Sequence, residues 1–259
     1  MITISKRLLQ ICMIMAAAVL LTACATTNPT KEPVNEEKLA HIHYQLGLDA
    51  LGKEGMLPKA FDELMTSNSL HPNQPEVLDA LAYAWLLRGD MDKSEQYYKK
   101  ALAHGASAAS QNNYANLLNR MQRFEEAEAM ARKSLDDPRY ANQDLAFINL
   151  GDALLGQKKA DAAITAYKQA QMFNPDSDRT EGKLANAFFQ QGRLNEAAII
   201  YYGLLRKDPG NRSLVEALVE VLKQQHKQGE ARHVLESFSK QSTSSLDKAW
   251  AMDKIGQLE

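Results

Sequence analysis

The chain has 259 residues, of which 45% are hydrophobic and 24% charged, a balance typical of globular proteins that can bury a core. Its net charge of −2 and its pI near 6.3 exclude the basic surface that a nucleic-acid backbone requires. Both cysteines, Cys12 and Cys24, lie in or beside an N-terminal apolar run. The body of the protein from residue 25 onward therefore holds neither a disulfide framework nor a zinc–thiolate site.

The N-terminus has the layout of a secretory signal peptide. Lys6 and Arg7 form a short positive region, and the apolar run LLQICMIMAAAVLLTA follows over residues 8–23. This run of 16 residues is shorter than the roughly 20 that a membrane-spanning helix needs. The alternative interpretation is an uncleaved N-terminal anchor with an idle cysteine.

The apolar run ends in the sequence LTAC at 21–24, which resembles the lipobox of bacterial lipoproteins. The resemblance implies that residues 1–23 are cleaved off and that Cys24 carries lipid, and two or more acyl chains hold a protein stably on a membrane. Ala25 stands where an aspartate would retain such a lipoprotein in the inner membrane, which implies the periplasmic face of the outer membrane. Residues 24–37 are polar and contain prolines, so we expect a flexible tether between lipid and domain.

The rest of the chain, 38–259, repeats a two-helix pattern about every 34 residues. A small residue usually stands at the eighth position of the first helix and another in the second helix twelve positions later. Gly151, Ala185 and Val219 occupy the eighth position in consecutive copies and are 34 residues apart. The pattern resembles the tetratricopeptide repeat (TPR) and predicts an all-α superhelical solenoid. The six predicted helix-turn-helix repeats span about 40–73, 75–106, 108–141, 144–177, 178–211 and 212–241.

The spacing of the small residues also predicts how the helices pack. We expect the small residue of the first helix to face the small residue of the second, so that the two helices approach closely and each pair stacks on the next. A generic helical bundle is the alternative, and the fixed period argues against it. After a polar break at 240–245, the segment 246–258 places Leu246, Trp250 and Ile255 mainly on one side. That pattern predicts a helix that caps the open end of the solenoid.

The third and fourth repeats carry motifs that are more specific than a generic repeat. They read QNNYA at 111–115, RFEEA at 123–127, DPRY at 137–140 and FINLG at 147–151. These motifs resemble the type IV pilus biogenesis lipoproteins of the PilF/PilW family, which combine a lipobox, a short tether and TPRs. The resemblance implies a pilotin, which binds the pilus secretin subunit, brings it to the outer membrane and promotes assembly of its multimer. A TPR lipoprotein scaffold for another envelope secretion or assembly complex is the alternative.

In such an array the first helices line the concave face, where positions two, five, nine and twelve point inward. In the first two repeats these positions include an apolar and aromatic patch made of Tyr44, Leu48, Tyr83 and Leu86. We expect this patch to receive an apolar segment of the protein partner. For the leucines, the alternative is packing within or between repeats.

In the third repeat the same positions hold a row of asparagines, Asn112, Asn116 and Asn119. A side-chain amide both donates and accepts hydrogen bonds, so the row could bind the backbone of the partner. The alternative is hydration or hydrogen bonding within the repeats.

The sequence contains no motif for phosphate binding, nucleophilic catalysis or zinc hydrolysis. His41 and His43 are two residues apart and would point about 200° apart on a helix, so they cannot share a metal ion. Glutamates such as Glu125 and Glu126 on a second helix usually form a solvated face. We therefore expect a protein that is not an enzyme and has no cofactor, metal ion, small-molecule substrate or nucleic-acid partner.

Overall fold

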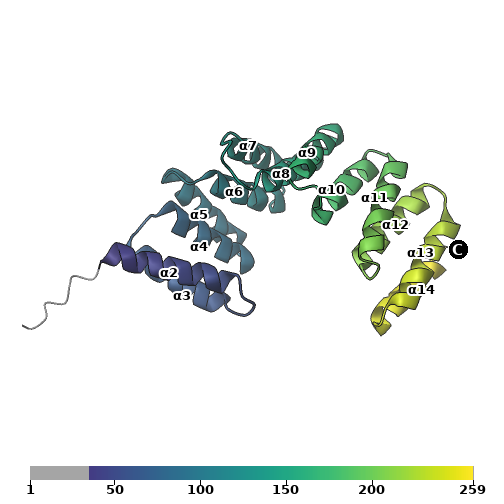
Figure 1. The fold of residues 1–259 in the computed structure, drawn as a ribbon, viewed down its shortest axis with the longest axis horizontal. Coiled ribbons are helices and arrows are strands. Elements are labelled where there is room, and N and C mark those ends of the chain that lie inside the picture. The colour runs from purple at the N-terminus through teal and green to yellow at the C-terminus, as the bar shows by residue number, and fades with distance from the viewer. Residues whose placement is uncertain (1–34, 259) are drawn as a thin grey trace, which may run out of the picture.

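A computed structural model describes residues 35–258, which form thirteen helices and no strand. Twelve of the helices form six successive pairs that follow one another along an arch, and the last helix stands at its C-terminal end (Figure 1). The pairs are α2 (Glu36–Leu51) and α3 (Leu57–Leu70), α4 (Pro75–Leu87) and α5 (Met91–Ala103), α6 (Ala108–Arg120) and α7 (Phe124–Leu135), α8 (Gln143–Gly156) and α9 (Ala160–Phe173), α10 (Asp178–Gln190) and α11 (Leu194–Lys207), and α12 (Arg212–Gln224) and α13 (Gln228–Gln241), followed by α14 (Ser245–Gly256). The predicted all-α solenoid of TPR-like repeats is confirmed.

Side-chain caps set the start of most first helices in the pairs. The Asn35 side chain accepts a hydrogen bond from Lys38 N at 3.0 Å at the start of α2, and Ser107, Ser177 and Asn211 act in the same way for α6, α10 and α12. Because this first cap starts α2 at Glu36, residues 36 and 37 are helical, although the sequence placed them in the tether. The predicted signal peptide, Cys24 and the tether residues 25–34 lie outside the described residues.

The turn inside each pair contains one residue in the left-handed backbone region. The six equivalent residues have φ angles between 58° and 88° and are Gly55, Gly89, Gln122, Lys158, Gly192 and His226. Glycine adopts this conformation without a steric penalty, whereas a side chain there places Cβ too close to the following carbonyl oxygen. Three of the six turns therefore carry backbone strain.

The residues at the eighth position of each repeat are buried, as close helix packing requires. A Cβ atom on Gly47 would lie 2.6 Å from Leu64 Cγ, and one on Gly151 would lie 2.4 Å from Tyr167 Cε1. In these two pairs the atoms nearest to the glycine belong to a large side chain and not to the small residue of the second helix. Each glycine instead makes room for a large buried side chain of the second helix, one turn beyond that helix's own small residue.

The last helix, α14, covers the C-terminal end of the array. The rings of Trp250 and Phe238 pack edge to face with their centroids 5.7 Å apart, and Ala251 and Ile255 are buried. Leu246 is 79% exposed, so the first turn of α14 contributes little to this contact, contrary to the predicted apolar side. Within residues 35–258, no helix combines the length and apolarity needed to cross a bilayer.

Candidate functional site: an inner groove

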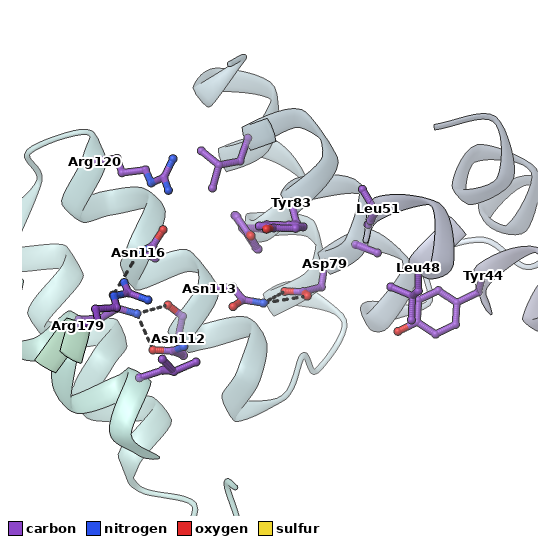
Figure 2. Close-up of a pocket in the computed structure, with 15 residues that line it drawn as sticks. Tyr44, Leu48, Leu51, Asp79, Tyr83, Asn112, Asn113, Asn116, Arg120 and Arg179 are labelled. Atoms are coloured by element: carbon purple, nitrogen blue, oxygen red, sulfur yellow. Dashed lines mark hydrogen bonds between the residues drawn. The ribbon is translucent and has the colours of Figure 1, made fainter. Parts of the chain in front are cut away.

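The first helices of the N-terminal pairs enclose a cavity of about 490 Å³, which we call the inner groove. Its walls come mainly from α2, α4 and α6, with contributions from α5, α8 and α10. Tyr44 and Leu48 lie at one end, Arg120 and Arg179 lie at the other, and Asp79 lies between them (Figure 2). The groove therefore changes from apolar to positively charged along its length.

The structure brings the four predicted apolar residues together but does not expose them equally. Tyr44 is half-buried, and Leu48 and Tyr83 are 37% and 43% exposed, so all three present surface to the groove. Leu86 also lines the groove but is only 7% exposed, because it packs in a core cluster with Tyr98. Most of the apolar surface of Leu86 is therefore buried and is not available to a partner.

The predicted asparagine row is engaged in hydrogen bonds between repeats. Asn149 Nδ2 on α8 donates to Asn112 Oδ1 at 2.7 Å and to the Asn112 carbonyl at 3.2 Å. Asn116 Nδ2 donates to Asn149 Oδ1 at 3.3 Å, and Asn119 Nδ2 donates to the Asn149 carbonyl at 2.8 Å. Asn112 and Asn116 line the inner groove, whereas Asn119 lines a separate depression beside it. These bonds occupy part of the hydrogen-bonding capacity of the row, while Asn119 Oδ1 is buried without a partner among the described residues.

A half-buried carboxylate, Asp79, lies in the middle of the inner groove. Burial raises its pKa, while hydrogen bonds from Ser110 and Asn113 act in the opposite direction. The Asn113 side chain donates to Asp79 Oδ2 at 3.2 Å, which links α6 to α4. Across the groove, burial raises the pKa of the Tyr44 hydroxyl, and the nearby acids Glu76 and Asp79 raise it further. The Tyr44 hydroxyl therefore stays protonated near neutral pH, and Asp79 keeps its proton to a higher pH than an exposed aspartate would.

The sequence did not predict several of the residues that line the groove, among them three that bear polar groups, Arg120, Arg179 and Tyr98. Arg120 and Arg179 are exposed cations at the C-terminal end of the groove, at positions thirteen and two of their repeats. Tyr98 reaches the groove from the second helix α5, although only first helices were expected there. The nearby cation Lys183 forms an ion pair, since its Nζ lies 2.8 Å from Asp152 Oδ2.

No group of three or more histidine, cysteine, aspartate or glutamate side chains with the geometry of a metal site occurs in the described part of the chain. His43 instead pairs with Glu63, with His43 Nδ1 and Glu63 Oε2 2.6 Å apart. The inner groove combines a concave shape with exposed apolar side chains at one end and positive charge at the other.

Two family models, both described as tetratricopeptide repeat, match residues 154–222 and 107–137. The chain therefore contains TPRs in its central and C-terminal parts. No curated protein matches the chain in sequence.

Among solved structures, PilF from Pseudomonas aeruginosa is 20% identical with a TM-score of 0.69, and the match covers 85% of this chain and 99% of that one. The structure of PilW, described as a widely conserved type IV pilus biogenesis factor, is 18% identical with a TM-score of 0.76 and coverages of 83% and 99%. A tetratricopeptide repeat protein from Parabacteroides merdae is 17% identical with a TM-score of 0.67 and coverages of 85% and 86%. At these identities the similarity establishes the fold.

Proposed function

We propose that this protein is a pilotin, an outer-membrane lipoprotein that binds the type IV pilus secretin and promotes its localisation and multimer assembly. The main support is the set of motifs in residues 111–151 that resembles the PilF/PilW family. The solenoid is also similar to PilF and PilW over nearly the full length of both proteins. A scaffold with an exposed groove and no metal-binding cluster among its described residues suits a binding function better than catalysis.

A second candidate is a lipoprotein scaffold for another envelope secretion or assembly complex. The observation that favours it is the TM-score of 0.67 to the Parabacteroides merdae repeat protein, which is close to the 0.69 for PilF. A TPR array of this length therefore resembles several proteins in shape, and the partner has to be identified by experiment.

The proposal includes a lipid anchor at Cys24 and a position on the periplasmic face of the outer membrane. It is supported by the LTAC sequence at 21–24 and by Ala25. In cells fed an alkyne-labelled palmitate, the wild-type protein should take up label and fractionate with the outer membrane. Cys24→Ser should lose the label and the membrane association. Unchanged labelling of Cys24→Ser would contradict the anchor.

In the proposed complex, Tyr44, Leu48 and Tyr83 contact an apolar segment of the secretin. The test of function uses a strain that lacks the gene. Loss of heat-stable secretin multimers while secretin monomer is still made supports the pilotin, and unchanged multimers exclude it in favour of the second candidate.

The test of the groove uses complementation of that strain. The double variant Tyr44→Ala with Tyr83→Ala should fail to restore multimers and should lose secretin in a pull-down. Tyr202→Ala on α11 is the matched control, because Tyr202 is 38% exposed and does not line the groove. Restoration by the groove variant would show that the secretin binds elsewhere.

A further inference from the structure

Within residues 35–258, Arg120 and Arg179 have neither an ion pair nor a hydrogen bond, as is also true of Arg88 and Arg206. Arg120 and Arg179 both line the inner groove, from α6 and α10 respectively. Several other arginines each pair with a carboxylate, namely Arg123, Arg132, Arg139, Arg193 and Arg212. Two unpaired guanidinium groups in one cavity form a site for a carboxylate, since each can donate two parallel hydrogen bonds to it.

A second, independent observation concerns Tyr98, a residue that also lines the groove and whose hydroxyl oxygen is buried. The side chain is 0% exposed, and its oxygen has no hydrogen-bond partner among the described residues. Two other buried tyrosines do have one: Tyr114 OH donates to Glu95 at 2.8 Å, and Tyr167 OH donates to Asp152 at 2.6 Å. A buried polar group without a partner costs free energy, so the Tyr98 hydroxyl would gain from a hydrogen bond to a group that enters the groove.

The charges around Tyr98 indicate the chemistry of the group to which its hydroxyl would donate. Burial raises the pKa of its hydroxyl, Asp79 and Tyr83 raise it further, and Arg120 lowers it, so all three lie close enough to act on it. The hydroxyl therefore stays protonated and can donate a hydrogen bond. A donor beside an unpaired arginine favours an acceptor with negative charge.

We propose that the inner groove binds an extended segment of a protein partner that carries an acidic side chain beyond an apolar one. The apolar side chain packs against Tyr44 and Leu48, and the carboxylate binds between Arg120 and Arg179 at the opposite end, with Tyr98 OH donating to the segment. This proposal rests on the proposed function only in that the groove receives a partner, and it does not require that partner to be a secretin.

The position of Asp79 restricts how such a segment can lie. Its carboxylate is in the middle of the groove, between the apolar end and the arginine end (Figure 2). An acidic side chain beside Asp79 would be repelled, so acidic residues are accepted only at the arginine end. The same carboxylate and the net charge of −2 make the groove a poor site for a polyanion such as a nucleic acid.

The experiment pans a random peptide library over the immobilised full-length protein. The peptides are fused to their carrier through the C-terminus, so that any carboxylate selected belongs to a side chain. Aspartate and glutamate should be enriched beside apolar residues on the wild-type protein and on the control Arg206→Gln. Arg206 is an exposed arginine on α11 that does not line the inner groove.

The double variant Arg120→Gln with Arg179→Gln should lose the acidic enrichment, while Arg120→Lys with Arg179→Lys should keep part of it. Peptides without acidic enrichment on the wild-type protein would overturn the proposal, and so would enrichment that survives the double glutamine variant. A selected peptide should lose about tenfold or more in affinity when its acid is replaced by the amide.

Tyr98→Phe separates a binding role from a structural one. It should weaken the selected peptide while raising the melting temperature, because the orphaned hydroxyl is removed. Unchanged peptide affinity would overturn the role of Tyr98. Peptide selection tests the chemistry of the groove, whereas the secretin pull-down tests the proposed function. Acidic peptides selected by a protein that does not bind secretin would support the groove proposal and exclude the pilotin.

Discussion

Asn149 Nδ2 donates to Asn112 Oδ1 over 2.7 Å, and both side chains are almost fully buried at 4% and 3% exposure. The bond joins the fourth repeat to the third beneath the inner groove. It is the centre of a small amide network that also includes Asn116 and the backbone of α8. Such a buried network contributes to stability only while every member keeps its partner.

We therefore expect Asn149→Ala to lower the free energy of unfolding by about 1–3 kcal/mol, because Asn112 is left buried without its donor. Asn186→Ala is the control, since Asn186 is half-buried on α10 and has no hydrogen bond within the described residues. It should change stability by less than about 0.5 kcal/mol. Urea unfolding followed by circular dichroism measures both. Equal effects of the two substitutions would show that the network contributes nothing.

Two helical glycines should respond to alanine in opposite directions. At Gly151 a Cβ atom would lie 2.4 Å from the Tyr167 ring, which is fully buried and held by Asp152, so Gly151→Ala should cost about 1–3 kcal/mol. At Gly203 on α11 nothing lies within 4 Å, so Gly203→Ala should stabilise by about 0.5–1 kcal/mol. Melting temperatures of the two variants test this, and a shift of the same sign in both would contradict it.

The left-handed turn residue His226 offers a stabilising substitution. It is exposed with φ of 58°, whereas Gly192 at the equivalent place in the previous repeat has φ of 76°. His226→Gly removes a strain of about 1–2 kcal/mol and costs part of it in backbone entropy, for a net gain of about 0.5–1 kcal/mol. His226→Ala keeps Cβ and should gain nothing. Denaturant midpoints that are equal for both variants would disprove the strain.

Glu95 should make stability depend on pH in the acidic range. Burial alone would raise its pKa, but hydrogen bonds from Lys99, Arg123 and Tyr114 outweigh it and hold the pKa at about 2, against a usual value of 4.5. Arg123 Nη1 and Tyr114 OH lie 2.5 Å and 2.8 Å from Glu95 Oε1. The stabilisation is therefore complete above about pH 4.5 and is lost as the pH falls toward 2.

The measurement compares the wild-type protein with Glu95→Gln. The wild type should be more stable by about 1–2 kcal/mol at pH 7, and the difference should shrink steadily between pH 5 and pH 2. Glu54→Gln, at an exposed glutamate without an ion pair in the described residues, should show no such trend. A difference between wild type and Glu95→Gln that is constant with pH would contradict the role of the ionised carboxylate.

The repeat architecture could be predicted because small residues recur where helices must approach closely. Gly151, Ala185 and Val219 are all buried, and each has the same place in its pair. The left-handed turns could be predicted only in part. Gly55, Gly89 and Gly192 stand at three of them, but Gln122, Lys158 and His226 adopt the same conformation without being residues that prefer it.

The groove could be predicted less completely, because it depends on how each repeat is rotated against the next. Positions five and nine of the first helix do face it, as Tyr44, Leu48 and Tyr83 show. The hydrogen bond between Asn112 and Asn149 spans 37 residues, and nothing local in the sequence indicates it. Arg120 and Arg179 come from helices two repeats apart and meet in one cavity only because the array curves.

The amide network beneath the groove has a consequence for binding. By bonding to one another, the three predicted asparagines and Asn149 hold α6 and α8 in a fixed relation. That stretch of the cavity floor is thus organised before any partner arrives, and little side-chain freedom remains to be lost when a complex forms. Most of the conformational entropy lost on association is therefore lost by the incoming segment. A segment that is already extended should bind more tightly than a flexible one of the same composition.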